Sequence, residues 1–272
     1  DVQKALALLR YYSPAPTAAP EICSGNRLMA ESTLSSADYY KKATAFWNYP
    51  EVPYGPSLRE MILPTDIVAD IGCGIGIVSR YLASISRGVI AIDKDENALK
   101  VLQEDLARQG PDNIEVVHAC WPNIHTQDWD VAVAFYHHNF GYTSPQVETL
   151  MQKTRRCGMI VAQGLRPREG FYEDLGREFG IVESERSCVG SCYVRGRLEQ
   201  AGFSVTCQEV FHDFGQPADS KAEVVAYAMK QLRLEDHQRQ HLEDVILDYV
   251  EYVDGKIVLP IKRYNCMLKF YK

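Results

Sequence analysis

The 272-residue chain lacks the features that point to a membrane or to nucleic acid. No apolar run is long enough for a membrane-spanning helix, and the first residues lack the basic start and apolar block of a secretion signal. The net charge is −7, and Lys and Arg form only short clusters, of which Lys262 with Arg263 is one. We therefore expect a cytoplasmic protein that acts on neither nucleic acid nor a membrane, with these clusters as solvated faces.

Cysteine clusters typical of zinc sites are also missing. The chain has eight cysteines, and its close pair, Cys188 and Cys192, has the spacing C-x-x-x-C. Such a pair alone does not make a structural zinc site, which needs two further ligands. We therefore expect free thiols and no metal, with a metal at this pair left open as an alternative.

The most informative segment is a glycine-rich turn between a strand and a helix. An apolar strand ends at Asp70, and Gly72, Gly74 and Gly76 follow at alternate positions. Glycine permits positive φ angles and a close approach of the backbone to a ligand, while the following helix offers unpaired N–H groups. The spacing differs from the G-x-G-x-x-G of dinucleotide sites, because Ile77 stands where the third glycine is needed. With the Asp70 carboxylate beside it, the turn predicts a ligand that carries positive charge.

A second apolar strand, residues 88–92, ends at another carboxylate, Asp93. An acid at the end of the second strand of a βαβ unit hydrogen-bonds ribose hydroxyls. At residues 70–76 and 93 the chain resembles the class I S-adenosylmethionine (SAM)-dependent methyltransferases, whose first motif is D/E-x-G-x-G-x-G. The resemblance implies SAM as the cofactor, with the glycines along its methionine and ribose parts, Asp70 organising the loop and Asp93 on the ribose diol. A tight turn without a ligand is the alternative.

Strands and helices alternate from residue 67 onward, which predicts one doubly wound α/β core. The resemblance implies a seven-stranded, mostly parallel sheet with the order 3-2-1-4-5-7-6, in which strand seven, residues 263–271, is antiparallel. The expected parts are an N-terminal segment with a helical cap (1–62), a SAM-binding core (63–218), a helical insertion (219–255) and C-terminal strands that complete the core sheet (256–272). The other strands are expected near 67–71, 88–92, 114–118, 130–136, 157–163 and 203–211, and the core helices near 76–86, 95–109, 145–155 and 194–201.

Further cofactor contacts are expected where strands two, three and four end. Lys94 stands where the family commonly has an apolar residue against adenine, so that its stem would cover the ring. The end of strand three lacks the family's acidic residue, which leaves backbone contact from Ala119 or Cys120. Trp121 would stack on the adenine, with a place in the core as its alternative. The remaining two candidates are Cys73 in the glycine loop and Tyr136 at the end of strand four.

Strand four, residues 130–136, leads into two histidines, His137 and His138. In an open α/β sheet the ligand lies at the carboxyl ends of the strands, where strands one and four diverge. A neutral imidazole there can take a proton from an attacking hydroxyl, amine or acidic carbon. Adjacent residues of an extended chain point to opposite sides, so at most one of the two is expected to face the pocket. A hydrogen-bonded loop anchor is the alternative role.

Aromatic residues are dense in the segment before the first strand. A helix is expected over 36–47, with Ser36 or Asp38 near its N-cap, and a second helix from position 56 or 57 to 62. Rings in such a cap can close over the cofactor and face the acceptor, or they can simply attach the cap to the core. The candidate acceptor-binding residues are Tyr39, Tyr40, Trp47, Arg166 and Tyr193.

The sequence thus predicts methyl transfer from SAM to a small or medium-sized acceptor molecule, at an O, N or C atom. Alignment supplies much of the rate, and a strand-four histidine adds base help where the acceptor arrives protonated. Two alternatives stay open: a transferase of another SAM group, such as aminopropyl, and a SAM-binding interaction module without turnover. The insertion could form a homodimer face, whose apolar positions are Val245, Ile246, Tyr249 and Val250.

Overall fold

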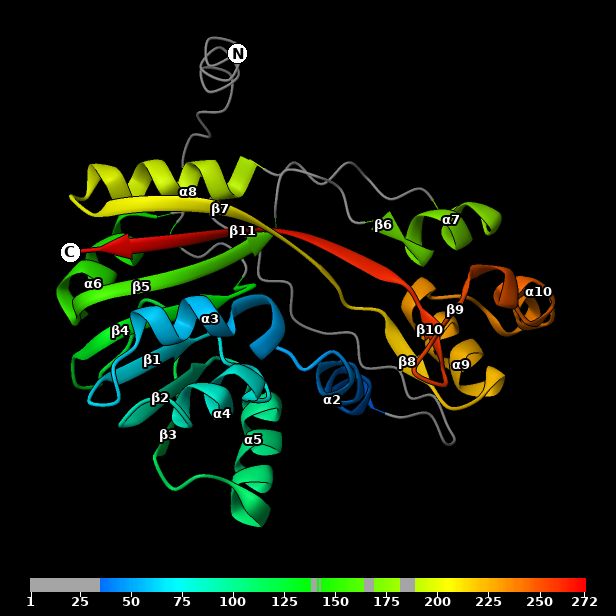
Figure 1. Ribbon diagram of the computed structural model, residues 1–272, viewed down its shortest axis with the longest axis horizontal. Helices are drawn as coiled ribbons and strands as arrows, with labels where there is room; N and C mark the ends of the chain where they lie inside the picture. The colour runs from blue at the N-terminus through cyan, green and yellow to red at the C-terminus, as the bar shows by residue number, and fades with distance from the viewer. Residues whose placement is uncertain (1–34, 138–140, 142, 164–168, 182–188) are drawn as a thin grey trace, which may run out of the picture. The chain divides into compact units, whose positions relative to one another are not determined.

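A twisted sheet with helices on both faces forms the core of the structure (Figure 1). The computed structural model describes residues 35–137, 141, 143–163, 169–181 and 189–272, all within the unit Thr33–Lys272. β1 to β5 pair in parallel in the order β3-β2-β1-β4-β5, and β11 joins β5 antiparallel, with β7 antiparallel on its other edge. This arrangement confirms the order 3-2-1-4-5-7-6 with an antiparallel seventh strand. The strands are β1 (Ile67–Ile71), β2 (Gly88–Asp93), β3 (Ile114–His118), β4 (Trp129–Phe135), β5 (Thr154–Gln163), β7 (Ser204–Asp213), β11 (Ile261–Tyr271) and the short β6 (Glu169–Gly170), which pairs with the start of β11.

Helices cover both faces of the parallel strands, which is why those strands are apolar along most of their length. Two sets of helices supply this cover, one for each face. The first set is α3 (Glu51–Met61), α4 (Ile77–Ala83) and α5 (Glu96–Gln109), and the second is α6 (Ser144–Lys153) and α8 (Val189–Gln200).

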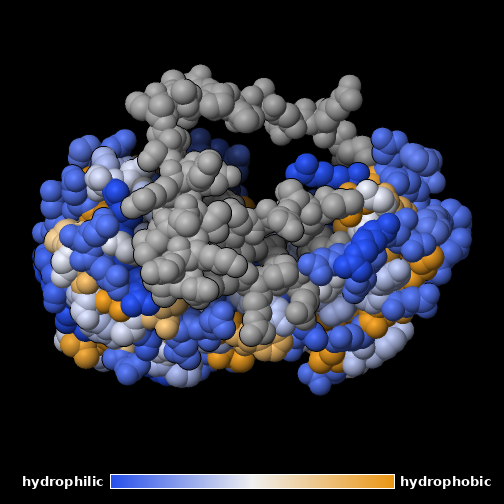
Figure 2. Space-filling model, turned by 90° about the horizontal axis from the view of Figure 1, so that it is seen from above, coloured by the Kyte–Doolittle hydropathy of each residue, from blue (hydrophilic) through white to orange (hydrophobic). Residues whose placement is uncertain are grey.

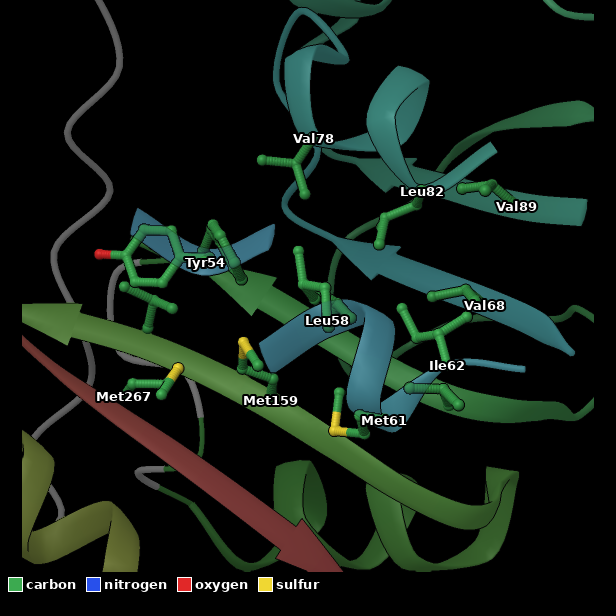
Figure 3. Packing of buried hydrophobic residues seen from close by; sticks show 14 of the residues in the cluster. Tyr54, Leu58, Met61, Ile62, Val68, Val78, Leu82, Val89, Met159 and Met267 are labelled. Atoms are coloured by element: carbon green, nitrogen blue, oxygen red, sulfur yellow. The ribbon is translucent and has the colours of Figure 1, made fainter. Parts of the chain in front are cut away.

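The face under α3 and α4 holds one large apolar cluster. Figure 3 shows Leu58 of α3 and Leu82 of α4 pointing toward the strand side chains of Val68 and Met159. Alternate strand residues point to opposite faces, so Ala69 belongs to the cluster under α6 and α8. The cluster under α3 and α4 attaches the helical cap directly to the edge of the sheet where a ligand is expected.

The first cap helix, α2 (Ser36–Phe46), begins after a reciprocal cap. The Asp38 N–H donates to Ser35 Oγ at 3.1 Å, and the Ser35 N–H donates to the Asp38 carboxylate at 3.1 Å. The N-cap is therefore Ser35, one residue before the expected Ser36, because only Ser35 is placed to make both bonds.

The second cap helix, α3, begins at Glu51 rather than at 56 or 57. Tyr54 and Leu58 are both fully buried and lie one turn apart, so a helix that includes both residues packs them together on the sheet. Pro56, which was expected to open the helix, lies inside it. Burial of Tyr54 outweighs the hydrogen bond that the proline cannot donate.

Residues 216–259 form a smaller layer beside the cap. A three-stranded sheet, β8-β10-β9, packs with helices around a cluster that includes Phe171 of α7 and Tyr39 of α2. Lys42 ties the cap to this layer through Asp219 at 2.5 Å and Glu223 at 2.6 Å. The elements are α7 (Phe171–Glu178), β8 (Gln216–Ala218), α9 (Lys221–Leu232), the 3-10 helices η1 (Asp236–Gln238) and η2 (Ile246–Tyr249), α10 (Arg239–Val245), β9 (Glu251–Val253) and β10 (Lys256–Leu259).

Two details of this layer differ from expectation. Residues 256–259 form β10, which pairs with β8 and β9 instead of completing the core sheet. Pro260 separates β10 from β11, because proline supplies no N–H to continue a ladder. The apolar positions proposed for a dimer face pack within this chain: Ile246 is fully buried, and Val245, Tyr249 and Val250 lie against the same cluster.

The surface of the described residues is mainly polar. On the face shown in Figure 2, hydrophilic residues predominate and apolar ones form small separate groups. Among the residues that the structure describes, no helix has both the length and the apolar character that a membrane span requires.

Candidate functional site

A cavity of about 530 Å³ lies at the carboxyl ends of β1 and β4. This volume falls within the range of ordinary small-molecule pockets. The lining comes from the glycine loop after β1, the start of α5, the cap and the end of β4. The lining includes Asp70, Gly72, Cys73, Gly74, Ile75, Ile77 and Val78 of the loop region, Asp95, Asn97, Ala98 and Val101 at α5, Ser36, Ala37, Tyr40 and Tyr49 of the cap, and Phe135 and Tyr136 after β4.

The loop has the backbone conformation that its glycines predict. Gly72, Gly74 and Gly76 have φ angles of +80°, +53° and +78°, a region that other residues rarely adopt. A Cβ on Gly72 would lie 2.5 Å from Cδ2 of His137, and one on Gly76 would lie 2.3 Å from a Leu102 methyl carbon. At two of the three positions, therefore, both the φ angle and the lack of space require glycine.

Backbone hydrogen bonds hold the loop over the end of β2. The N–H groups of Gly72 and Cys73 both donate to the Ile92 carbonyl, at 2.7 and 3.0 Å. The Gly74 N–H donates to Oδ2 of Asp93 at 2.7 Å, and the Asp95 N–H donates to Oδ1 at 2.9 Å. Asp93 thus supports the loop itself, and its carboxylate keeps lone pairs for a further donor.

Asp70 is a buried carboxyl group in the wall of the cavity. Its side chain is 1% exposed, and Oδ2 accepts a hydrogen bond from the Ser79 hydroxyl at 2.6 Å. Burial raises the pKa of Asp70 to about 7, and the nearby Asp93 charge acts in the same direction. A cation in the cavity would favour the ionised form, which agrees with a positively charged ligand.

The end of strand four contributes rings to the cavity and an imidazole behind it. Phe135 and Tyr136 line the cavity, and Tyr136 has a φ of +54°. The Tyr136 hydroxyl lies 3.2 Å from the Tyr54 hydroxyl, which holds the ring toward α3. His137 is half-buried and packs on the Cα side of Gly72. His138 lies outside the described residues.

The cap residues expected to bind the acceptor separate into different places. Tyr40 lines the cavity, and burial raises its pKa to about 12. Tyr39, the preceding residue, packs against Tyr227 with ring centroids 4.9 Å apart. Trp47 donates from Nε1 to the Gly215 carbonyl at 2.6 Å and does not line the cavity. Tyr193 is an exposed residue of α8, on the opposite face of the sheet, and Arg166 lies outside the described residues.

The candidates after strands two and three lie beside the site rather than in the cavity wall. Lys94 and Cys120 are exposed, and the Ala119 N–H donates to the Asp93 carbonyl at 2.9 Å. Trp121 is 6% exposed and belongs to the apolar cluster under α6 and α8. Its indole therefore packs in the core of the described structure, which was the alternative weighed for it.

The described residues hold no cluster of His, Cys, Asp and Glu that could bind a metal ion. Cys73 and Cys192 are free thiols, and burial raises the pKa of Cys73 well above its usual value. Cys73 lines the cavity as a small neutral side chain. The partner proposed for Cys192, Cys188, lies outside the described residues.

Sequence reasoning missed a polar group behind Tyr136. Arg263, expected on a solvated face, has a buried Nε atom. Its Cζ lies 5.3 Å from the Tyr136 ring centroid and 3.6 Å from that of Phe214. Asn265 donates to the Tyr54 hydroxyl at 2.9 Å. The sequence pattern that could have revealed Arg263 is the alternation along β11, in which Arg263, Asn265 and the buried Met267 lie on one face.

Comparisons with known proteins agree with this geometry. Residues 68–158 match the family described as a methyltransferase domain. A ribosomal protein L11 methyltransferase of Acetivibrio thermocellus is 32% identical over 121 residues, or 43% of this chain and 38% of that protein. A probable cobalt-precorrin-6B C(15)-methyltransferase (decarboxylating) of Methanothermobacter thermautotrophicus is 28% identical over 153 residues, or 51% of this chain and 79% of that protein.

Solved structures show the same fold at low identity. The YcgJ protein of Bacillus subtilis is 10% identical with a TM-score of 0.50, and the match covers 82% of this chain and 98% of that one. Protein BH2331 of Bacillus halodurans C-125 is 16% identical with a TM-score of 0.50, over 80% of this chain and 97% of that one. At such identities the likeness concerns the fold alone.

Proposed function

Since the chain belongs to the class I SAM-dependent methyltransferases, with the methyltransferase domain at residues 68–158, we propose that it transfers a methyl group from SAM to a small or medium-sized acceptor. The observation that carries the proposal is the cavity of about 530 Å³ over the glycine loop. The loop, a buried carboxyl group and a ring of the cap all meet there. Tyr40 and Tyr49 of the cap line the cavity, and its volume suits a small molecule better than a large polymer.

The residues present fit SAM on two counts. A Cβ on Gly74, which lines the cavity, would meet nothing within 4 Å, so the loop backbone faces open space where a ligand can approach. Asp70 lies in the cavity wall as a carboxyl group with no cation beside it among the described residues, which suits a cationic ligand. We assign the cofactor to Asp70, Gly72, Cys73 and Gly74 of the cavity wall, and to the Asp93 carboxylate, which lies outside that wall but accepts from the Gly74 N–H. Gly76 supports the loop, and the candidates Lys94, Ala119, Cys120 and Trp121 also lie outside the cavity wall.

SAM supplies an electrophilic methyl group on a sulfonium, so the protein needs chiefly to align an acceptor with it. Tyr40 and Tyr136 both line the cavity, and their rings would confine the acceptor. Phe135 and Tyr49 line the same cavity and would exclude water from it. For an acceptor that arrives protonated, His137 is the described candidate for the base, with Nε2 as the atom that takes the proton.

Two other functions remain as competitors. A transferase of another SAM group, such as aminopropyl, would use the same loop, and an interaction module would bind SAM without turnover. The names of the two relatives give a ribosomal protein and a cobalt-precorrin as their substrates, so these names do not indicate one class of acceptor. The volume of the cavity, about 530 Å³, favours the small molecule.

Labelled SAM separates the three functions. The protein is incubated with a metabolite extract and SAM that carries 14C either in the methyl group or in the aminopropyl carbons. Label from the methyl group alone supports the proposal, label from the aminopropyl group supports the first competitor, and binding without product supports the second.

Calorimetry tests the site itself. Asp93→Asn is expected to weaken SAM binding about tenfold, or about 1.4 kcal/mol, because an amide cannot accept from Gly74 and Asp95 and also from a ribose hydroxyl. Asp112→Asn, at an exposed position before β3, is the control and should bind as the wild type does. No heat with SAM or with its demethylated product, from folded protein, would overturn the proposal.

A further inference from the structure

Arg263 carries a positive charge into the wall behind the cavity, and no described carboxylate pairs with it. Its Nε atom is buried and has no hydrogen-bond partner among the described residues. Each ion pair found among those residues has another side chain as its cation, as the pairs of Lys41 and Lys269 show. An arginine that loses water without gaining an anion is costly, so such an arrangement calls for a ligand that supplies the charge.

The guanidinium group lies between two rings. Its Cζ is 3.6 Å from the Phe214 centroid and 5.3 Å from that of Tyr136, and Tyr136 lines the cavity. Tyr40 and Tyr49, on the cap side of the cavity, pack around Phe214 at centroid distances of 5.9 and 5.3 Å. The cation therefore lies behind the rings of Tyr40, Tyr49 and Tyr136, which we call the aromatic end of the cavity, and does not itself line the cavity.

The sheet topology explains why the cation is at this edge. Asn265 pairs with Gln163, the last residue of β5, and β11 runs antiparallel to β5. Arg263, two residues earlier in β11, therefore lies just beyond the carboxyl end of β5. That is the edge of the sheet where the cavity opens.

The neighbours of Arg263 add no negative charge. His212, across from it in β7, has its pKa lowered to about 4 by burial and by the arginine, so it is neutral at pH 7. Burial raises the pKa of Tyr40 to about 12 and that of Tyr49 well above its usual value, so both remain phenols. Nε2 of His212 is also buried without a partner among the described residues.

We infer that the acceptor carries a carboxylate, which Arg263 binds at the aromatic end of the cavity while the rings of Tyr40 and Tyr136 hold an apolar body. The inference rests on the proposed function, since it names the class of acceptor for the same site. A planar guanidinium pairs with a carboxylate through two parallel N–H bonds. With Asp70 in the cavity wall as well, the site offers one charged group for a cationic cofactor and another for an anionic acceptor.

Benzoate and benzamide form the probe pair, because they share a shape and differ in charge. Each is titrated into the full chain saturated with S-adenosylhomocysteine, with binding followed by NMR. We expect benzoate to bind at least about tenfold more tightly than benzamide, since only benzoate pairs with the cation. Equal binding of the two would overturn the inference.

Variants of β11 assign the effect to one side chain. Arg263→Gln should weaken benzoate about tenfold or more and leave benzamide unchanged, while Arg263→Lys, which keeps the charge, should restore part of the difference. Lys262→Gln, the neighbour on the opposite face of the strand, is the matched control. Unaltered S-adenosylhomocysteine binding shows that each variant is folded, and benzoate binding by Arg263→Gln equal to the wild type would refute the inference.

Turnover separates this inference from the function on which it rests. A metabolite extract is divided on an anion-exchange column, and each fraction is incubated with methyl-labelled SAM. Label confined to the retained, anionic fraction supports both proposals, and label confined to the unretained fraction supports methyl transfer and refutes the carboxylate acceptor. No label in either fraction counts against methyl transfer, while the benzoate titration still decides the carboxylate site.

Discussion

Asp70→Asn is the substitution that tests the electrostatics of the cavity most directly. Because burial raises the Asp70 pKa from 3.8 to about 7, the folded protein holds a proton there that the unfolded chain has lost above pH 4. The free energy of unfolding therefore falls as pH rises from about 4 to about 7. Between pH 5 and pH 8 the linkage amounts to about 3 kcal/mol, and the neutral Asn variant avoids it while its Oδ1 still accepts from Ser79.

Urea unfolding at pH 5, 6, 7 and 8 measures the effect as a difference between wild type and variant. His212 gives a slope of opposite sign, since its lowered pKa makes stability rise with pH between about 4 and 6.5. That slope is present in both proteins and cancels in the difference. A difference that stays constant from pH 5 to pH 8 would show that the Asp70 carboxyl titrates normally and would refute the reasoning.

The same carboxyl group predicts how cofactor affinity varies with pH. SAM binding to the wild type should strengthen as pH rises through about 7, because ionised Asp70 attracts a cation. Asp70→Asn should bind SAM more weakly above pH 7 and with little dependence on pH. Calorimetry in buffers of different ionisation enthalpy detects the proton that the wild type releases on binding near neutral pH.

Three further predictions concern the loop and the cap. Gly72→Ala should lower the free energy of unfolding by about 3 kcal/mol, because the new Cβ adds φ strain and clashes with His137. Gly74→Ala should lower it by only about 1 kcal/mol, because its Cβ meets nothing within 4 Å. Equal costs of the two variants in urea unfolding would contradict the clash. Tyr54→Phe should cost about 1 to 2 kcal/mol, because it leaves a buried amide without its acceptor, and an unchanged urea midpoint would contradict this. Tyr40→Ala should raise the acceptor KM about tenfold, because Tyr40 lines the cavity. Tyr39→Ala should lower the free energy of unfolding by about 3 kcal/mol and leave KM unchanged, because Tyr39 packs in the smaller layer. The reverse pattern in steady-state kinetics and urea unfolding would contradict the assignment of the two rings.

The cofactor loop could be predicted from the sequence because its determinants are local. Asp70 and the glycines lie within a few residues of one another, and the backbone conformation of Gly72 follows from its own lack of a side chain. The positions of the parallel strands also followed, because their apolar runs are continuous and easy to place, whereas the order of the strands came from the resemblance. The resemblance supplied the antiparallel last strand.

The acceptor side of the cavity could not be predicted in the same way. Tyr39 and Tyr40 are adjacent and chemically identical, and only the packing of α2 between two layers decides which ring enters the cavity. Trp121 was equally suited to stacking and to the core until the position of α6 was known. Arg263 looked solvated beside Lys262, because the aromatic residues that bury it come from distant segments.

Hydrogen bonds that hold the cap in place join distant parts of the described chain, and this has a consequence for biosynthesis. The bond from Asn265 to Tyr54 spans 211 residues, and that from Trp47 to the Gly215 carbonyl spans 168. β1 to β5, together with α3, which packs on Val68 of β1 and Met159 of β5, can assemble as they leave the ribosome, yet these two bonds of the cap cannot form until Gly215 and β11 have been translated. A ribosome stalled before β11 therefore carries a chain that already has the glycine loop and the cap helices but lacks Arg263 and Asn265, the polar groups behind the rings of the cavity.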